Sequence, residues 1–204
     1  MKILVTGFKP FGGERINPSE EVVRRLPAAL GGVELVSLIL PVERRESVAQ
    51  AAQAIRTHRP QAVVSIGQAG GRSAVTVERV AINLDDFSIP DQKGEQPRGE
   101  PVAAEGPDAY LCRLPVEEMV GAIRARGVPA ALSLSAGTYV CNHLMYAVCH
   151  LMARELPQAM GGGFIHIPYL PQQVLDKPQQ PSMTLEQSLL GVEAALEALA
   201  SGMA

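Results

Sequence analysis

Short aliphatic runs alternate with longer amphipathic segments from one end of the chain to the other. Runs of strand length occupy residues 3–6, 33–40, 62–66, 130–135 and 163–167. Segments with apolar residues at helical spacing occupy residues 17–30, 46–58, 116–126, 141–156 and 184–201. Such alternation is typical of β-α-β units, in which helices cover both faces of a mostly parallel, twisted sheet. We therefore predict one α/β domain over residues 1–204, built as a three-layer α/β/α sandwich.

The first helical segment carries a start signal. Asn17 stands where an N-cap is expected, Pro18 suits the first helical position, and Glu20 suits the third. Apolar residues continue at helical spacing as far as Leu30, so we expect the helix to extend through that residue.

Two segments depart from the alternating pattern. Residues 75–82 are extended by composition, but their alternation changes phase at Glu78 and Arg79, which predicts a bulge or a bend. Residues 90–108 contain four Pro, three Gly and five acidic residues and show no periodicity. A loop of this length in a compact domain is usually a lid, a binding loop or an oligomer contact, with a disordered insertion as the alternative.

Composition narrows the classes of partner. Apolar residues make up 47% of the chain, which has only four Phe, four Tyr and no Trp, so the core must be mainly aliphatic. The 18 basic and 21 acidic residues give a net charge of −3 without any basic run, which argues against nucleic acid as a partner. No apolar run approaches the roughly 18 residues of a membrane span, and the N-terminal run is too short for a signal peptide. We therefore expect a cytoplasmic protein that does not bind membranes.

The cysteines and the glycine-rich loops argue against cofactors. Cys112, Cys141 and Cys149 are an odd number without C-x-x-C spacing, which disfavours both a disulfide scaffold and a zinc site. The glycine-rich loops at residues 7–13 and 67–72 fit neither the P-loop nor the G-x-G-x-x-G pattern. We therefore expect neither a metal nor an organic cofactor.

Cys141 differs from the other two cysteines because it opens a predicted helix. A thiol there faces unpaired backbone N–H groups and the positive end of the helix dipole, and both favour the thiolate. The same N–H groups can stabilise a developing oxyanion. Cys141 is therefore the candidate nucleophile, whereas Cys112 and the mid-helix Cys149 are expected to be structural.

His166 and Glu78 are the candidate partners of this nucleophile. A catalytic cysteine needs a base with a pKa near 7 and a third group that orients the base. His166 lies at the carboxyl end of a predicted strand, where α/β proteins bind ligands, although a lone His in an apolar strand is more often a core residue. Glu78 is the candidate orienting carboxylate, with Asp85 and Asp86 as rivals.

Several separate motifs along the sequence are similar, in the same order, to motifs of one family. They are residues 6–13 (TGFKPFGG) with Asn17-Pro18-Ser19, residues 67–72, residues 78–83, Ile89-Pro90-Asp91, residues 136–143 and His166-Ile167-Pro168. Through these words the chain resembles pyroglutamyl-peptidase I, also called pyrrolidone-carboxylate peptidase, a family of cysteine peptidases. The resemblance runs along nearly the whole chain.

The resemblance implies an exopeptidase (omega-peptidase) that removes an N-terminal pyroglutamyl residue from peptide substrates through a thioester acyl-enzyme. It implies that Cys141 attacks the carbonyl carbon, that His166 serves as base and then protonates the leaving amine, and that Glu78 orients His166. It also implies a homotetramer that needs no metal and no organic cofactor.

The resemblance further implies a pocket for the pyrrolidone ring, which is flat and uncharged and therefore suits a site between aromatic faces. Phe8 and Phe11 are expected to line this pocket, while Asn17 and the Gln68 backbone meet the polar atoms of the ring. Further walls are expected from Ile89, Tyr139 and Val140. The alternatives are core packing for the two phenylalanines and a helix cap for Asn17.

One position departs from the family pattern. Ser88 stands where the family commonly has Arg. We therefore expect the backbone N–H of Cys141 to be the main donor to the oxyanion, with Arg72 as an alternative cation.

Two other functions stay open at this point. One is a non-catalytic binder of pyroglutamyl peptide N-termini, and the presence of Cys141, His166 and Glu78 together favours the enzyme over it. The other is an amidase or thioesterase on the same scaffold, which would keep the Cys and the His but would not need paired phenylalanines around a ring.

Overall fold

The computed structural model describes residues 1–203. Seven of the described strands form one sheet: β1 (Lys2–Phe8), β2 (Ala29–Leu30), β3 (Val33–Leu40), β4 (Ala62–Gln68), β5 (Val75–Glu78), β8 (Ala130–Ser133) and β9 (Gly161–Ile167). A separate ribbon consists of β6 (Val80–Ile82) and β7 (Ala109–Leu111). The helices are α1 (Pro18–Val23), α2 (Arg44–His58), α3 (Val116–Ala125), α4 (Val140–Glu155) and α5 (Leu185–Ser201), with a short 3-10 helix, η1 (Pro171–Gln173).

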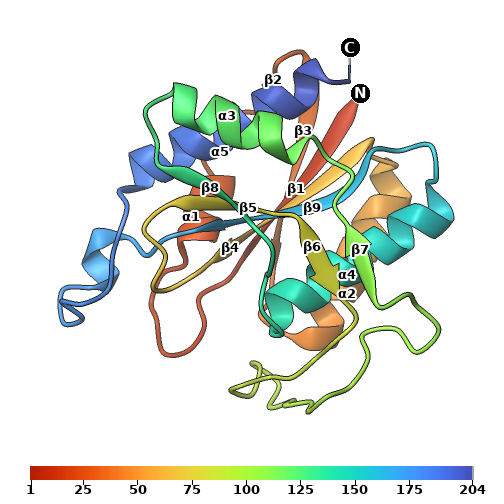
Figure 1. Cartoon of the computed structure of the whole chain (residues 1–204), viewed down its shortest axis with the longest axis horizontal. Coiled ribbons are helices and arrows are strands. Elements are labelled where there is room, and N and C mark those ends of the chain that lie inside the picture. The colour runs from red at the N-terminus through yellow and green to blue at the C-terminus, as the bar shows by residue number, and fades with distance from the viewer. Residues whose placement is uncertain (204) are drawn as a thin grey trace.

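The main sheet has the strand order β2-β3-β1-β4-β9-β5-β8. β1 is parallel to β3 and β4, and β4 is parallel to β9, so these strands all run in one direction (Figure 1). β5 runs antiparallel to β9 and parallel to β8, and β2 runs antiparallel to β3. The predicted mostly parallel sheet is confirmed, with a reversal of direction at β5 that the hydrophobic pattern did not indicate.

Helices cover both faces of this sheet (Figure 1). α5 contacts α1 and α3 on one face, and α2 contacts α4 on the other. The central strands β1, β4 and β9 are therefore buried on both faces, which explains why they read as continuous apolar runs rather than alternating ones. The predicted three-layer α/β/α sandwich is confirmed.

The first helix is shorter than predicted. α1 begins after its N-cap Asn17, as expected, but it ends at Val23, and Leu30 belongs to β2. Pro27 accounts for the difference, because proline lacks an N–H and disfavours the helical conformation of the residue before it. Leu26 and Leu30 still pack against the core, so the apolar spacing beyond Val23 reflects a turn and an edge strand rather than a helix.

The predicted break at Glu78 and Arg79 is the point where the chain leaves the main sheet. β5 ends at Glu78, and β6 begins at Val80 in the ribbon with β7, which contacts α4. The bend is confirmed. The apolar alternation changes phase here because the chain passes from the main sheet to the two-stranded ribbon. Glu78 is thus the last residue of the main sheet before the chain crosses over.

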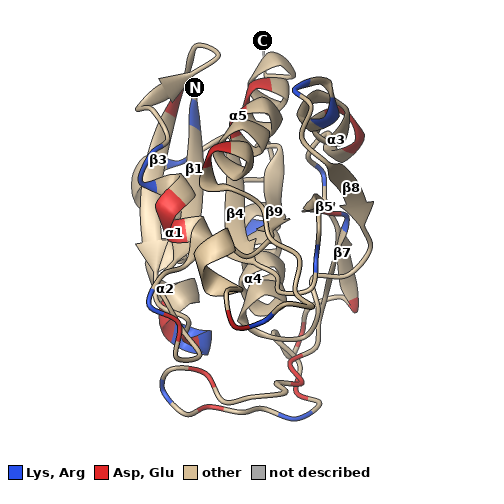
Figure 2. Ribbon diagram, turned by 90° about the vertical axis from the view of Figure 1, so that its left-hand side faces the viewer, with Lys and Arg blue, Asp and Glu red and all other residues tan. Residues whose placement is uncertain are grey.

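Residues 83–108 form the long loop between β6 and β7. The Asp91 carboxylate accepts hydrogen bonds from the backbone N–H groups of Arg44 (2.7 Å), Lys93 (2.9 Å) and Glu95 (2.9 Å). Acidic and basic residues are interspersed along the loop, which extends from the lower end of the molecule (Figure 2). The bond from Arg44 ties the loop to α2 and the other two hold the loop in a turn, so it is an ordered element and the alternative of a disordered insertion is wrong.

Candidate active site

Glu78 and His166 form a buried acid–base pair. His166 Nδ1 lies 2.8 Å from Glu78 Oε1, a distance at which the ring N–H donates to the carboxylate, and the two residues are 4% and 0% exposed. The antiparallel register of β5 and β9 sets this pair, because Thr76 lies opposite His166 and Glu78 follows two residues later on the same face of the sheet. The geometry is that predicted for a base and its orienting carboxylate.

The surroundings fix the protonation of both groups. Burial lowers the pKa of His166, and the hydrogen bond and charge of Glu78 oppose this lowering without overcoming it. Burial would raise the pKa of Glu78, but the hydrogen bond and charge of His166, together with the hydrogen bond from Arg72, hold it below its usual value. The imidazole is therefore neutral and the carboxylate ionised near pH 7. Because Nδ1–H donates to Glu78, Nε2 is the nitrogen that can accept a proton.

Cys141 lies at the second position of α4, directly after Val140, and it is partly exposed. A Cβ atom on Gly67 would lie 3.1 Å from the Cys141 sulfur, so the thiol lies over the bare backbone of Gly67. Gly67 is the register partner of His166 across β4 and β9. The thiol and the imidazole therefore flank the same point of the sheet. Within residues 1–203 no hydrogen bond joins them, and such bonds often tighten only when substrate is bound.

The thiol of Cys141 is protonated in the resting site. Burial raises its pKa to about 12, the charge of Glu78 adds to the rise, and the charge of Arg72 and the backbone N–H of Cys141 oppose it. The helix N-terminus favours the thiolate, as the sequence indicates, but burial outweighs this effect. A neutral thiol beside a neutral imidazole can become a nucleophile only by transferring its proton.

Cys112 and Cys149 lie elsewhere in the core, at the beginning of β9. Both sulfurs are 3.4 Å from the carbonyl oxygen of Gly162. Burial raises the pKa of Cys112 to about 11 and that of Cys149 to about 12. Both residues are buried, which agrees with the structural role expected for them.

The two phenylalanines of the first loop occupy different environments. Phe8 is buried, with its ring centroid 6.4 Å from that of Phe164, so it packs in the core as the alternative interpretation holds. Phe11 is partly exposed, and its ring centroid lies 6.4 Å from that of Tyr139, which in turn contacts Phe87 at 4.7 Å. Phe11 and Tyr139 therefore form an aromatic pair at the surface, beside the start of α4.

Asn17 is the N-cap of α1. Its Oδ1 accepts hydrogen bonds from the Ser19 N–H (3.0 Å) and hydroxyl (2.9 Å), and its Nδ2 donates to the carbonyl of Lys9 (3.0 Å). The Ser19 hydroxyl in turn accepts the Phe8 N–H at 2.9 Å. Asn17 thus ties the phenylalanine loop to α1. Its side chain is buried and acts as a helix cap, which was the alternative to ring binding.

The remaining residues predicted for the pocket differ in exposure. Val140 is fully buried, so its side chain belongs to the core. Ile89 is 47% exposed. The Gln68 side chain, at the end of β4, accepts a hydrogen bond from Gln173 Nε2 at 2.8 Å. Ile89 and Gln68 thus remain accessible in part, whereas Val140 does not.

The rival carboxylates do not contact His166. Asp85 is buried and pairs with His143 Nδ1 at 2.8 Å and with Arg44 Nε at 2.7 Å, so a second acid–histidine pair joins the loop 83–108 to α4 and α2. Asp86 is exposed, 3.8 Å from Arg98. Among the three carboxylates considered, Glu78 alone pairs with His166.

Arg72 and Gln173 are site neighbours whose contacts could not be predicted from the sequence. Arg72 Nη1 lies 2.5 Å from Glu78 Oε1, across the six-residue separation between the glycine-rich loop and the end of β5. Gln173, in η1, is buried in a proline-rich segment without periodicity, and its amide links Gln68 to the first loop. Of the two, only Arg72 lies in a motif singled out from the sequence, the glycine-rich loop of residues 67–72.

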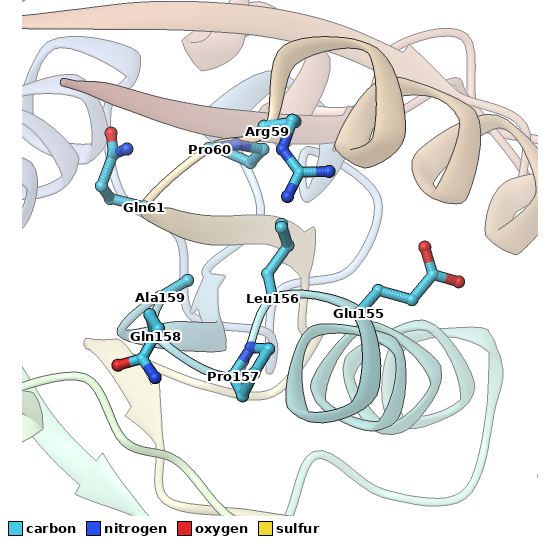
Figure 3. Close-up of a pocket in the computed structure, with 8 residues that line it drawn as sticks. All are labelled: Arg59, Pro60, Gln61, Glu155, Leu156, Pro157, Gln158 and Ala159. Carbon is cyan, nitrogen blue, oxygen red and sulfur yellow. The ribbon is translucent and has the colours of Figure 1, made fainter.

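A surface pocket lies at the opposite edge of the sheet (Figure 3). It has a volume of about 290 Å³ and is lined by residues 59–61, before β4, and 155–159, before β9. None of the residues predicted for catalysis or ring binding lines it. Among residues 1–203 no group of three or more His, Cys, Asp or Glu side chains is placed to hold a metal ion, and no helix has the length and apolar character to cross a membrane.

Comparison with known proteins identifies the family. The model of the family described as pyroglutamyl peptidase matches residues 1–201. The chain belongs to the pyroglutamyl peptidase family. The pyrrolidone-carboxylate peptidase of Levilactobacillus brevis is 52% identical over 199 residues, which cover 98% of this chain and 97% of the relative. Pyrrolidone-carboxylate peptidase 1 of Caldanaerobacter subterraneus subsp. tengcongensis is 48% identical, with 100% of both chains covered.

Solved structures of the family share the fold. The crystal structure of pyroglutamyl peptidase I from Bacillus amyloliquefaciens superposes with a TM-score of 0.95 at 45% identity, covering 98% of this chain and 97% of that one. The pyrrolidone carboxyl peptidase from Thermococcus litoralis gives 0.95 at 35% identity, covering 99% and 94%. The resemblance described from the sequence words is thus confirmed, and the chain has the fold of a cysteine peptidase family.

Proposed function

We propose that this chain is a cysteine omega-peptidase that hydrolyses the peptide bond after an N-terminal pyroglutamyl residue, with Cys141 as nucleophile, His166 as base and Glu78 as orienting carboxylate. The observation that supports it most directly is the buried pair of Glu78 and His166 beside a thiol at the start of α4. Family membership supports the substrate class, because the similar proteins are named pyrrolidone-carboxylate peptidases.

The reaction begins with a proton transfer. His166 Nε2 takes the proton of the Cys141 thiol as the sulfur bonds to the carbonyl carbon, and the carbonyl oxygen becomes an oxyanion. Glu78 stabilises the imidazolium through Nδ1–H. The imidazolium then gives its proton to the leaving amine, the C–N bond breaks, and a thioester remains on Cys141. His166 next takes a proton from water, the resulting hydroxide attacks the thioester, and pyroglutamate leaves as the thiol is protonated again.

Backbone N–H groups at the start of α4 supply the oxyanion site in this proposal. The first N–H groups of a helix have no acceptor within the helix, and here they belong to Val140 and Cys141. Ser88 is exposed and carries no charge, so it cannot replace the cation common at that position in the family. The Cys141 N–H is therefore the proposed main donor.

The ring pocket is proposed between the phenylalanine loop and the end of β4. The Ala69 N–H donates to the Ile167 carbonyl, and successive strand residues point their backbone groups to alternate sides, so the N–H and C=O of Gln68 point toward β1. β1 pairs with β4 only as far as Ser65, which leaves the Gln68 groups for the ring amide. Phe11 and Tyr139 are the proposed aromatic walls, whereas Phe8 and Asn17 support the loop from behind.

A pair of fluorogenic amides tests this function. We expect the reduced protein to cleave a pyroglutamyl amide on the order of 10³-fold faster than the matching prolyl amide, whose ring lacks the carbonyl acceptor. Cys141→Ala, which keeps the pocket, serves as the inactive control. Absence of turnover by folded wild-type protein would overturn the peptidase in favour of the non-catalytic binder, and equal cleavage of both amides would favour the general amidase.

Self-association and a reducing compartment complete the proposal. The resemblance implies a homotetramer, and the exposed apolar side chains of Leu175 (84% exposed) and Leu134 (70%) are candidate contacts for it. Three free cysteines, one of them the proposed nucleophile, support action in the cytoplasm. Light scattering of wild type and Leu175→Glu tests the assembly, and a monomeric wild type would exclude it.

A further inference from the structure

We propose that Arg72 is a positioning residue of the catalytic pair: its guanidinium holds Glu78 in the orientation that presents Oε1 to His166. The inference rests on the proposed peptidase function, since it concerns the same acid–base pair. It assigns a role in catalysis to a residue that lies outside the Cys–His–Glu set.

The guanidinium joins three separate segments around the pair. Nη1 lies 2.5 Å from Glu78 Oε1 and also donates to the Thr76 hydroxyl, so it grips two residues of β5 on one face. Nη2 donates to the carbonyl of Ser135 at 3.1 Å, in the loop that leads to Cys141. Arg72 itself ends the glycine-rich loop that follows β4. The planar fork of an arginine suits this arrangement, because its donors are fixed relative to one another.

Glu78 depends on Arg72 because both hydrogen bonds to its carboxylate fall on the same oxygen. Oε1 receives both the His166 N–H at 2.8 Å and the Arg72 N–H. Oε2 is buried and has no hydrogen-bond partner within residues 1–203. Without the guanidinium, rotation about the carboxylate bond could exchange the two oxygens or withdraw both from the ring. Arg72 therefore determines which oxygen faces His166 and in which direction.

The charge of Arg72 also keeps the imidazole in its basic form. The ionisable groups that face His166 are Glu78 on β5, Cys141 on α4 and Arg72 in the glycine-rich loop. If the guanidinium is removed, a buried carboxylate is left with the imidazole as its only cationic partner. His166 would then hold its proton to higher pH, so a smaller fraction of it would be unprotonated and free to accept the proton of Cys141.

A purely structural role makes a different prediction. If Arg72 only fastened the loops, its loss would lower the melting temperature and the amount of folded enzyme, but it would leave the titration of His166 unchanged. The decisive measurement is therefore the protonation of His166 in the folded protein, which NMR reports through the imidazole Cε1–H and which does not require turnover.

The test compares wild type with Arg72→Gln, Arg72→Lys and Arg79→Gln. Arg79 is a matched control, because it lies on the same chain segment and pairs with Glu117 rather than with Glu78. His166→Gln assigns the His166 resonance. In Arg72→Gln we expect the His166 titration midpoint to move to higher pH by about one pH unit and kcat for the pyroglutamyl amide to fall about 10- to 100-fold, with KM little changed. In Arg72→Lys the midpoint should stay near that of wild type, while kcat falls because an ammonium cannot hold all three acceptors.

An unmoved His166 midpoint in folded Arg72→Gln, or the same shift in Arg79→Gln, would overturn the proposal. If Arg72→Gln does not fold, Arg72→Lys carries the test, and an unchanged kcat in that variant would overturn it. A wild type that folds but cleaves no pyroglutamyl amide would refute the proposed function, and the NMR titration would still decide whether Arg72 controls the acid–base pair.

Discussion

Gly67 and His166 lie opposite each other on the parallel strands β4 and β9. A Cβ atom on Gly67 would come within 2.8 Å of the Phe164 ring and 3.1 Å of the Cys141 sulfur. The missing side chain therefore provides the space in which a thiol from α4 reaches the sheet beside the imidazole. The site depends on this glycine for its volume.

Gly67→Ala should disable the enzyme while leaving it folded. The added methyl group must displace either the Phe164 ring or the thiol, so we expect kcat/KM to fall about 100-fold and the free energy of unfolding to fall by about 1–3 kcal/mol. Kinetics with a pyroglutamyl amide and urea unfolding measure the two effects. Gly121→Ala, in α3, is the control, because nothing lies within 4 Å of its added Cβ and both quantities should stay the same or rise slightly. Full activity of Gly67→Ala would contradict the placement of the thiol.

The three cysteines should separate by function. Cys141→Ser is expected to lose activity by about 10³-fold or more, because the hydroxyl is a weaker nucleophile, whereas Cys112→Ala and Cys149→Ala should retain most activity and lose only stability. Iodoacetamide followed by peptide mass spectrometry gives a second readout. All three thiols have raised pKa values, so accessibility decides the order, and Cys141 is the one that is partly exposed. If Cys149→Ala is inactive instead, Cys141 is not the nucleophile and the assignment is wrong.

Much of the fold could be predicted because the strands and helices are long enough for the hydrophobic period to identify them. The direction of β5 could not be predicted, since the hydrophobic pattern of a strand does not indicate whether it runs parallel or antiparallel to its neighbours. That reversal matters for the site, because it sets the register that brings Glu78 to His166. The sequence words marked Glu78 and His166 as partners, but only the pairing of the strands explains why they meet.

Activity and stability should both fall in mild acid. The pKa of folded His166 lies below its ordinary value of 6.5, so kcat/KM should hold at pH 6.5 and decline only at lower pH as the base is protonated. Between the folded and the ordinary pKa the unfolded chain binds more protons, so the free energy of unfolding decreases as pH falls through this window, by about 1.4 kcal/mol for each pH unit. Urea unfolding at pH 8 and pH 5 measures the effect. His166→Gln should reduce this dependence, and an unchanged slope would contradict a buried neutral imidazole.

Gln173 should control substrate affinity rather than the chemical step. Its Nε2 lies 2.8 Å from Gln68 Oε1 and 3.4 Å from the Ile16 carbonyl, so it fixes the end of β4 relative to the phenylalanine loop. We expect Gln173→Ala to raise KM about tenfold with kcat changed less than threefold, because the walls of the ring pocket lose their common support. The exposed neighbour Gln172→Ala should match wild type. A loss confined to kcat would place Gln173 in the chemistry instead.

The residues around the ring pocket show what sequence motifs cannot predict. The motifs assigned Phe8, Phe11, Asn17 and Val140 to the pocket alike, but only Phe11 of these four is partly exposed. A motif indicates that a residue is required, but it does not indicate whether the residue touches the ligand or supports the wall. The capping pattern of Asn17 and Pro18 did predict the N-cap of α1 correctly, because it depends only on neighbouring residues. Burial, which separates contact from support, arises from packing between distant segments.

The raised pKa of Cys141 bears on how the enzyme would survive oxidative stress. Peroxides attack the thiolate far faster than the thiol, and a cysteine that rests as a protonated, recessed thiol is a poor target for conversion to sulfenic and sulfinic acids. In the proposed mechanism the sulfur gives its proton to His166 only as it bonds to the substrate carbonyl, so a free thiolate would be short-lived. The same burial that slows the formation of the nucleophile thus preserves it between turnovers.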